Sequence, residues 1–247
     1  MEVWNYGWTT SEETDVTVPA RNEWLIDLAA PVGPQLRRIL RERIIRADLR
    51  PGTLLSESEI AGVYDVSRQP VREAFIKLAE DGLVEIRPQR GTIVRKISRN
   101  AVMDARFVRE AVEADIVRLI VEQVPTSAVI ADLRRLIAMQ VEASKGDRAW
   151  FMELDEQFHR ALAMAAGKIG AWRVIESSKS QMDRVRYLST LHFPMRKLVD
   201  QHAAIVDAIE AREPKKANDA MRLHLREVLN DLPTIAAAAP ELFEAED

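Results

Sequence analysis

Three of the chain's four histidines, together with one aspartate, are placed where they could bind a metal ion. Asp155 and His159 are four residues apart, so on a helix they lie one turn apart on one face, beside an apolar stripe. His202 and His224 each interrupt the apolar stripe of a later helical segment. A polar group buried without a hydrogen-bond partner costs about 1 to 3 kcal/mol. These inward-facing imidazoles therefore need partners, and a shared cation would supply one.

The types of these side chains decide which cations fit. Three imidazoles and one carboxylate suit a borderline divalent metal, with zinc, nickel and manganese as candidates, whereas calcium and magnesium prefer sites built from oxygen atoms. A single buried histidine is more often a core residue than a ligand, so the prediction depends on the joint pattern. We expect one divalent ion, with zinc as the metal of the purified protein, to be bound by Asp155, His159, His202 and His224. His192 lacks an inward-facing stripe and is not part of this set.

A second group of residues is suited to reading DNA. Residues 56–59, Ser-Glu-Ser-Glu, have the pattern of a capping box that begins a short helix, and residues 64–66 supply a turn. Ser67 is placed to begin the next helix, whose first turn tolerates Pro70. The N-terminal end of such a second helix enters the major groove in helix-turn-helix proteins. Three side chains project there, opposite the apolar stripe, and are predicted to contact the operator: Arg68, Gln69 and Arg72.

A β-hairpin is predicted directly after this helix. Residues 83–87 and 92–95 are β-prone runs separated by Pro-Gln-Arg-Gly. We expect Arg90 and Gly91 at the hairpin tip to lie against the DNA backbone or the minor groove. Upstream, apolar residues from 36 to 44 have helical spacing, and the helix is closed by Pro51-Gly52. The whole segment therefore reads as a winged helix-turn-helix.

The charge distribution agrees with this interpretation. The chain has a formal net charge of −4, which is unexpected for a DNA-binding protein. Residues 31–96, however, contain 13 Lys and Arg against 9 Asp and Glu, a local charge of +4 that leaves −8 for the remainder. The positive charge lies on the predicted DNA-binding segment.

The part of the chain that carries the metal set is predicted to be almost wholly helical. After Ser98, a helix cap, turn signals near Pro125, Gly146, Gly167, Pro194 and Pro214 divide it into six segments, each with apolar residues at helical spacing. At 247 residues the chain can form two modest domains. The expected fold is mainly α, with an N-terminal winged helix-turn-helix and a C-terminal six-helix bundle. The expected division is an arm at 1–30, a DNA-binding domain at 31–97, a helical domain at 98–235 and a tail at 236–247.

The DNA-binding segment resembles the GntR family of bacterial transcription regulators over residues 34–97. The resemblance rests on motifs that occur in the family's order and spacing: Pro51-Gly52, Ser56-Glu57, Ser67-Arg68-Gln69-Pro70-Val71-Arg72-Glu73-Ala74, Asp81-Gly82-Leu83 and Arg90-Gly91-Thr92. It implies a homodimer on a two-fold operator.

Residues 100–232 resemble the FadR C-terminal domain, the helical effector-binding module of one GntR subfamily, and are most similar to its six-helix VanR subgroup. The matching segments are Asp155-Glu156-Gln157-Phe158-His159, Gln201-His202 through Ile209, and Ala220-Met221-Arg222-Leu223-His224. The resemblance implies the same four metal ligands and an effector pocket that Arg109 faces. Gln201 stands where a glutamate is common. A metal and an arginine in one pocket favour a planar anion, so we expect a small carboxylic acid as effector, such as an aromatic acid, a sugar acid or a dicarboxylate.

These patterns predict a metabolite-responsive transcription regulator, a repressor that the acid releases from its operator. Absence of cysteine excludes disulfides and thiolate metal sites, and the lack of a membrane span or signal peptide predicts a cytoplasmic protein. Two alternatives remain open: a metal-dependent hydrolase, although no general base stands at a recognisable spacing, and a regulator for which the metal itself is the signal.

Overall fold

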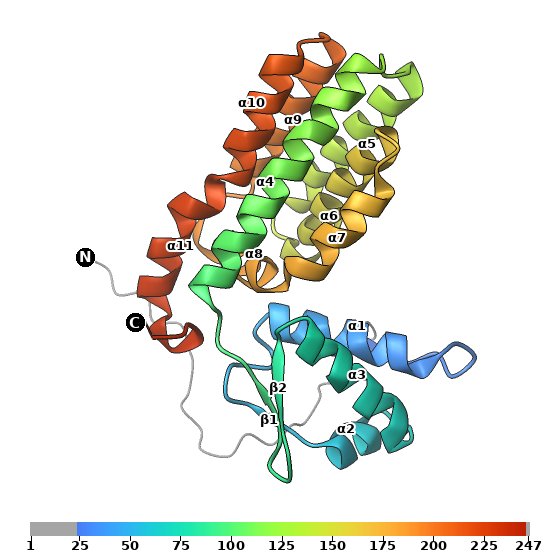
Figure 1. Ribbon diagram of the computed structural model, residues 1–247, viewed down its shortest axis with the longest axis vertical. Helices are drawn as coiled ribbons and strands as arrows, with labels where there is room; N and C mark the ends of the chain where they lie inside the picture. The colour runs from blue at the N-terminus through green and yellow to red at the C-terminus, as the bar shows by residue number, and fades with distance from the viewer. Residues whose placement is uncertain (1–23, 246–247) are drawn as a thin grey trace.

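The structure, a computed structural model, describes residues 24–245 and places the chain in two domains stacked along its long axis (Figure 1). Most of the predicted N-terminal arm, residues 1–23, lies outside the described residues. Its last part is described, and there Trp24 is buried with the guanidinium of Arg46 5.0 Å from its ring centroid.

The N-terminal domain is the predicted winged helix-turn-helix. Its helices are α1 (Val32–Ile45), α2 (Glu57–Val63) and α3 (Arg68–Glu80). Its strands β1 (Leu54–Leu55), β2 (Val84–Arg87) and β3 (Gly91–Val94) form an antiparallel sheet in the order β1-β3-β2. The predicted hairpin is thus β2–β3. The sequence did not reveal the additional strand β1, because it is only two residues long.

Local chemistry explains these elements. Ser56 caps α2 by accepting a hydrogen bond from the backbone N–H of Glu59 at 3.5 Å. The apolar stripe of α3 packs inward against α1 and the sheet, burying Val71, Ala74, Phe75 and Leu78. The DNA-binding domain therefore has its own core, and the opposite side of α3 is left to solvent.

The C-terminal domain is a bundle of helices, and the mainly α fold class is confirmed. Its elements are α4 (Arg99–Glu122), α5 (Ser127–Ala143), α6 (Arg148–Ala165), α7 (Ile169–Ser178), α8 (Ser180–His192), α9 (Arg196–Glu210), α10 (Pro214–Leu225) and α11 (Glu227–Ala238), followed by a short 3₁₀ turn at Pro240–Leu242.

The predicted number of helical segments needs a correction, because eight helices occupy the described part of this domain rather than six. The fourth segment is divided at Lys179 into α7 and α8, where the hydroxyls of Ser177 and Ser178 donate to the carbonyl of Val174 and weaken the helix end. The sixth segment is divided at Arg226 into α10 and α11. Apolar periodicity continues across both breaks, so it could not reveal them.

Two cores lie within the C-terminal domain. The larger one fills the bundle between α4, α5, α6, α9 and α10, and a smaller one joins α8 and α11 to the start of α4. Residues 240–245 fold back onto that start, where Phe243 is buried and pairs with Ile97. Among residues 24–245, no helix has the length and apolar character needed to span a bilayer.

Candidate metal centre and nucleic-acid interface

The four predicted metal ligands converge inside the bundle from three helices. α6 contributes Asp155 and His159, α9 contributes His202, and α10 contributes His224. Each offers one ligand atom, and these atoms all lie within 4.8 Å of one another. All four side chains are buried. His192 is exposed at the end of α8, away from this cluster.

A second layer of side chains holds the Nδ1 atom of each histidine. Glu113 Oε2 lies 2.5 Å from Nδ1 of His159. Gln140 Oε1 is 2.7 Å from Nδ1 of His202, and Gln201 Oε1 is 3.0 Å from Nδ1 of His224. Histidine ligands of metals commonly donate their second N–H to a carboxylate or a carbonyl oxygen, which fixes the ring orientation.

The two glutamines are themselves held so that only their oxygens can face the imidazoles. The amide nitrogen of Gln140 donates to the Leu154 carbonyl at 3.1 Å, and that of Gln201 donates to Glu227 Oε2 at 2.7 Å. Gln201 stands where the resemblance led us to expect glutamate. Its side-chain oxygen still accepts a hydrogen bond from His224, while its amide nitrogen donates to the carboxylate of Glu227. His202 and His224 are each left with Nδ1 as donor and Nε2 as acceptor.

This arrangement fits a metal ion. The Nε2 atoms of His159 and His202 each lie 3.2 Å from Nε2 of His224, and in the His202–His224 pair two acceptors face each other, which cannot form a hydrogen bond. The buried Oδ1 of Asp155 has no hydrogen-bond partner and lies 3.6 Å from Nε2 of His202. A separation near 3.2 Å is close to the edge of about 3.3 Å expected when nitrogens surround zinc tetrahedrally at about 2.0–2.1 Å. Lone pairs that repel one another are thus directed at a common point.

The charges around the cluster favour the same conclusion. Burial lowers the pKa of His202 to about 3, and burial with the neighbouring His202 and His159 lowers the pKa of His224 well below its usual range. Burial alone would raise the pKa of Asp155, but the guanidinium of Arg186 and the three neighbouring imidazoles together outweigh it and hold that pKa well below its usual range. At neutral pH these imidazoles are uncharged and the carboxylate is ionised, which are the forms that bind metals.

Arg109, predicted to face the effector pocket, is buried on α4 with 2% of its surface exposed. Its Nε lies 2.5 Å from Glu113 Oε1. Burial would raise the pKa of Glu113, but Arg109 and His159 hold it at about 2. Arg109 therefore stabilises the carboxylate that contacts His159, a predicted metal ligand, and the sequence did not reveal this second-layer role.

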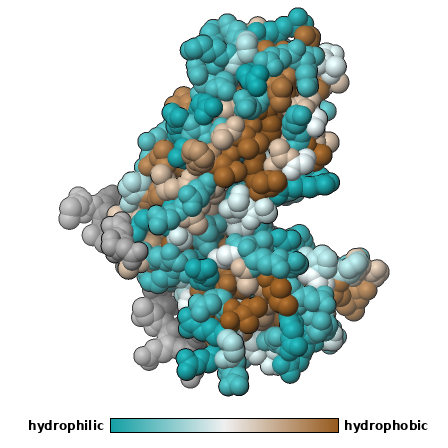
Figure 2. Space-filling view, in the orientation of Figure 1, coloured by the Kyte–Doolittle hydropathy of each residue, from teal (hydrophilic) through white to brown (hydrophobic). Residues whose placement is uncertain are grey.

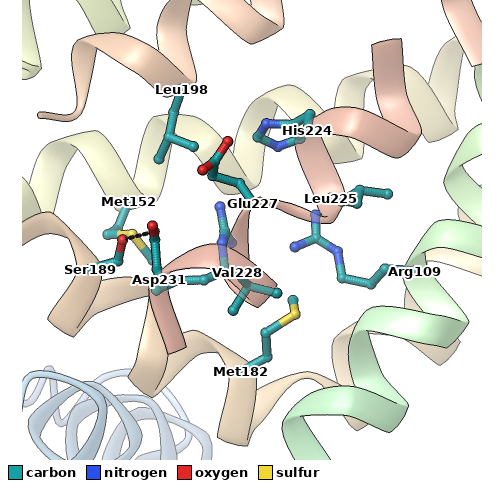
Figure 3. A pocket seen from close by; sticks show the side chains of 11 residues that line it. Arg109, Met152, Met182, Ser189, Leu198, His224, Leu225, Glu227, Val228 and Asp231 are labelled. Carbon is teal, nitrogen blue, oxygen red and sulfur yellow. Dashed lines mark hydrogen bonds between the residues drawn. The ribbon is translucent and has the colours of Figure 1, made fainter. Parts of the chain in front are cut away.

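A small cavity adjoins the cluster, and Figure 3 shows Arg109 and His224 directed into it from α4 and α10. Its volume is about 30 Å³, room for one or two water molecules. Its apolar wall includes Met152, Met182 and Leu198. The polar side chains that line it are Arg109, Arg186, Ser189, His224, Glu227 and Asp231.

Sequence reasoning missed one residue of this site, Gln140, and did not select another, Arg186. Gln140 continues the apolar stripe of α5 at the spacing after Ile137, so a buried polar residue there was a readable signal. Arg186 lines the cavity and forms an ion pair with Asp155 Oδ2. It lies on a helix whose stripe alone gave no reason to select it.

The predicted DNA contacts lie on the opposite end of the molecule from the bundle (Figure 1). Arg68 and Arg72 project from the first turns of α3 and are exposed, with 65% and 56% of their side chains accessible. Both pair with Glu57 on α2, at 3.3 Å for Arg68 Nη2 and 2.9 Å for Arg72 Nε. Glu57 is an anion within the predicted DNA-binding face that sequence reasoning did not select.

The other predicted contacts differ in kind. Gln69 donates to Glu73 Oε1 at 3.0 Å on the same face. Arg90 lies in the exposed turn between β2 and β3. Gly91 has a φ of +87°, and a Cβ there would lie 3.0 Å from Leu54 Cδ1. The glycine is thus required by the backbone and by close packing in the wing.

Comparison with known families agrees with this architecture. The family model described as "Bacterial regulatory proteins, gntR family" matches residues 34–94, and the FCD domain model matches residues 104–227. The HTH-type transcriptional repressor RspR of Escherichia coli K12 is 39% identical over 217 residues, which cover 87% of this chain and 95% of that protein. This chain belongs to the GntR family. It combines the family's helix-turn-helix domain with an FCD domain.

Other members extend the comparison. The probable D-xylose utilization operon transcriptional repressor of Paenarthrobacter nicotinovorans is 31% identical, covering 78% of this chain and 85% of that protein. Among solved structures, a putative GntR transcriptional regulator from Rhodococcus sp. RHA1 is 25% identical with a TM-score of 0.66, covering 81% of this chain and 97% of that one. E. coli McbR/YncC is 19% identical with a TM-score of 0.71, covering 82% and 97%, and shows the shared fold. Members of this GntR and FCD group are DNA-binding transcription regulators and not enzymes.

Proposed function

We propose that this GntR-family member is a repressor that a small carboxylic acid releases from its operator. One observation carries the proposal: a buried metal-ligand cluster borders a cavity that an arginine enters, in a chain that also presents an exposed pair of arginines on α3. The two sites lie in different domains of one chain, as a ligand-controlled regulator requires (Figure 1).

At the DNA end, Arg68, Gln69 and Arg72 read the operator from the major groove, and Arg90 with Gly91 sets the wing against the backbone or the minor groove. Exposure of both arginines at the N-terminal end of α3 supports this role. Their contact with Glu57 is exposed and therefore weak, so phosphates or base edges can replace it.

At the other end, Asp155, His159, His202 and His224 hold one divalent ion, zinc in the purified protein, with nickel or manganese as alternatives. Bound there, the ion supplies Lewis acidity toward a carboxylate oxygen. Arg109 presents a planar set of donors to the same ligand. The cavity has room for only one or two water molecules, so binding of even a small acid requires lining side chains such as Arg109 or Arg186 to move.

A homodimer is supported by an exposed apolar surface over α4 and α7 (Figure 2). On these two helices Phe107 and Val174 are 65% and 60% exposed, and Val108, Val112 and Ile169 are half-buried. Apolar patches of this kind mark interfaces, and a two-fold dimer would present two winged helices to DNA. Because its proposed target is DNA, we place the protein in the cytoplasm. Phe107→Asp should shift the protein toward monomer in light-scattering chromatography, whereas Leu223→Asp, equally exposed on α10, should not.

The effector proposal is tested by calorimetry. A panel of small carboxylic acids and their neutral amides is titrated into zinc-loaded wild type, His224→Ala and Arg109→Ala. Acids should bind and amides should not, with both substitutions weakening the acid. Equal affinity for acid and amide would contradict the proposal. If zinc addition alone released DNA, the metal would be the signal instead.

A further inference from the structure

Helix α8 touches both the metal cluster and the DNA-binding domain. Gln181 Nε2 donates to the Gly82 carbonyl at 2.6 Å, and Arg184 Nη1 donates to the Arg95 carbonyl at 2.8 Å. On the same helix, Arg186 pairs with the metal ligand Asp155. One helix of 13 residues thus spans the distance between the two sites.

A series of ionised side chains of alternating sign runs along this helix to α1. Its members, from the metal cluster outward, are Asp155, Arg186, Asp183 and Arg41. Asp183 Oδ2 lies 2.5 Å from Arg41 Nη2 and 2.7 Å from Lys179 Nζ. These side chains are buried or half-buried, so water screens their interactions less than it does at the surface. The series therefore links a metal ligand to the DNA-binding domain.

One contact of the series is loose. Arg186 Nη1 is 3.9 Å from Asp183 Oδ1, and this oxygen is buried without a hydrogen-bond partner. Arg186 is instead drawn to Asp155 on its other side. Arg186 can therefore pair with either of two carboxylates, and in this structure it lies closer to Asp155 than to Asp183.

The far end of the series is tied to the DNA-reading helix. On α1, one turn before Arg41, Arg37 Nη2 lies 3.1 and 2.9 Å from the two carboxylate oxygens of Asp81, the residue that caps α3. Because α1 and α3 also share one apolar core, a movement of α1 would be transmitted to α3.

We propose that Arg186 is a switch between the two sites. When a cation shares the charge of Asp155, Arg186 turns toward the vacant oxygen of Asp183, which then holds Arg41 less firmly and loosens α1 from α8. This inference rests on the proposed metal site for its signal, but its ion-pair series can be tested without metal.

Hydrogen–deuterium exchange of the full chain, prepared metal-free and then given zinc, tests the switch. In wild type, zinc should slow exchange in α6, α9 and α10 and speed it in α1 by about fivefold or more, the scale of coupled charge networks. Asp155→Asn without metal should speed α1 in the same way. In Arg186→Gln, zinc should still bind, but α1 should no longer respond.

Controls keep the outcomes distinct. In Asp183→Asn, hydrogen–deuterium exchange in α1 should be fast with or without zinc. This variant tests the ion-pair series even if Arg186→Gln does not fold. Asp200→Asn removes an exposed pair with Arg196 on α9 and should behave as wild type. Zinc binding with unchanged or slower α1 exchange would overturn the switch. If zinc does not bind, the metal proposal fails, and unchanged α1 exchange in Asp155→Asn would by itself overturn the switch.

Discussion

The DNA-reading face and the metal cluster use similar ionic groups in opposite surroundings. On α3, the exposed Arg68 and Arg72 share one half-buried carboxylate, Glu57. In the bundle, Arg109 and Glu113 are each only 2% exposed, and Glu113 also contacts His159, one of the proposed metal ligands. Exposed pairs contribute little and exchange partners easily, whereas buried charges are costly to leave alone.

The difference matches what each region must do. A DNA contact must be free to leave its partner for phosphate or base, so a weak, exposed pair suits it. A metal ligand must be held in one orientation and one protonation state, which the second layer of Glu113, Gln140 and Gln201 provides. The following predictions test whether the contrast is real.

The largest effect should follow metal removal. Chelation of zinc, or His224→Ala, should lower the melting temperature by about 10 °C, since a ligand at about 1,000 times its Kd contributes about 4 kcal/mol. Thermal unfolding with elemental analysis measures this. His192→Ala, an exposed histidine outside the cluster, is the control and should retain the metal.

Loss of a reader arginine should come next. Arg72→Ala and Arg68→Ala should each weaken operator binding by about 1 to 3 kcal/mol, because base-edge contacts have that value. Fluorescence anisotropy at two salt concentrations measures the affinity and separates base contacts from phosphate contacts. Lys77→Ala, an exposed cation in the last turn of α3, should have little effect. If both arginine variants bind as wild type, the assignment of α3 is wrong.

A second-layer change should weaken the metal without removing it. Glu113→Gln has one acceptor oxygen, so it cannot serve both Arg109 and His159, and zinc affinity should fall by about 10- to 100-fold. Competition with a chromophoric chelator measures the affinity. Glu122→Gln on the same helix removes only an exposed pair and should leave zinc binding unchanged.

Acid should weaken the bundle through Glu110. Hydrogen bonds from Arg226 first, and then from Arg222 and Arg106, outweigh burial and lower the pKa of Glu110 to about 2. Because the pKa of Glu110 is lower in the folded state, its ionised carboxylate stabilises the folded protein above the unfolded pKa near 4.5. This stabilisation is lost as the pH falls toward about 2. Denaturant unfolding of metal-free protein at about pH 5 and about pH 3 should show this loss, and Glu110→Gln should reduce it. An equal loss in both proteins would show that other carboxylates are responsible.

The smallest effect should come from Glu57, the carboxylate that pairs with both arginines of α3. Arg72 is the main cause of the lowered pKa of Glu57, so Glu57 is ionised at neutral pH and competes with phosphates for both arginines. Glu57→Gln should tighten DNA binding by about 0.2 to 1 kcal/mol, mostly for any sequence rather than for the operator alone. Glu59→Gln, on the same helix, is the matched control. Weaker binding by Glu57→Gln would show that Glu57 positions the arginines instead of competing for them.

Local sequence determined a large part of this protein. Turn residues, a helix cap and helical apolar spacing identified α1, α2, α3 and the wing, because each depends on neighbours within a few residues. The same periodicity put the metal-set histidines on inward faces. It did not reveal the breaks at Lys179 and Arg226, since an apolar stripe has the same spacing on both sides of a break.

Tertiary structure decided what those side chains meet. Gln140 and His202 are 62 residues apart in sequence, and Arg41 and Asp183 are 142 apart, so no local pattern pairs them. Which residue fills the second layer depends on how α4, α5 and α9 pack, and Arg186 has a role only because α8 lies between α6 and α1. Periodicity determines which face of a helix is buried, whereas the partner on that face is decided only when the helices assemble.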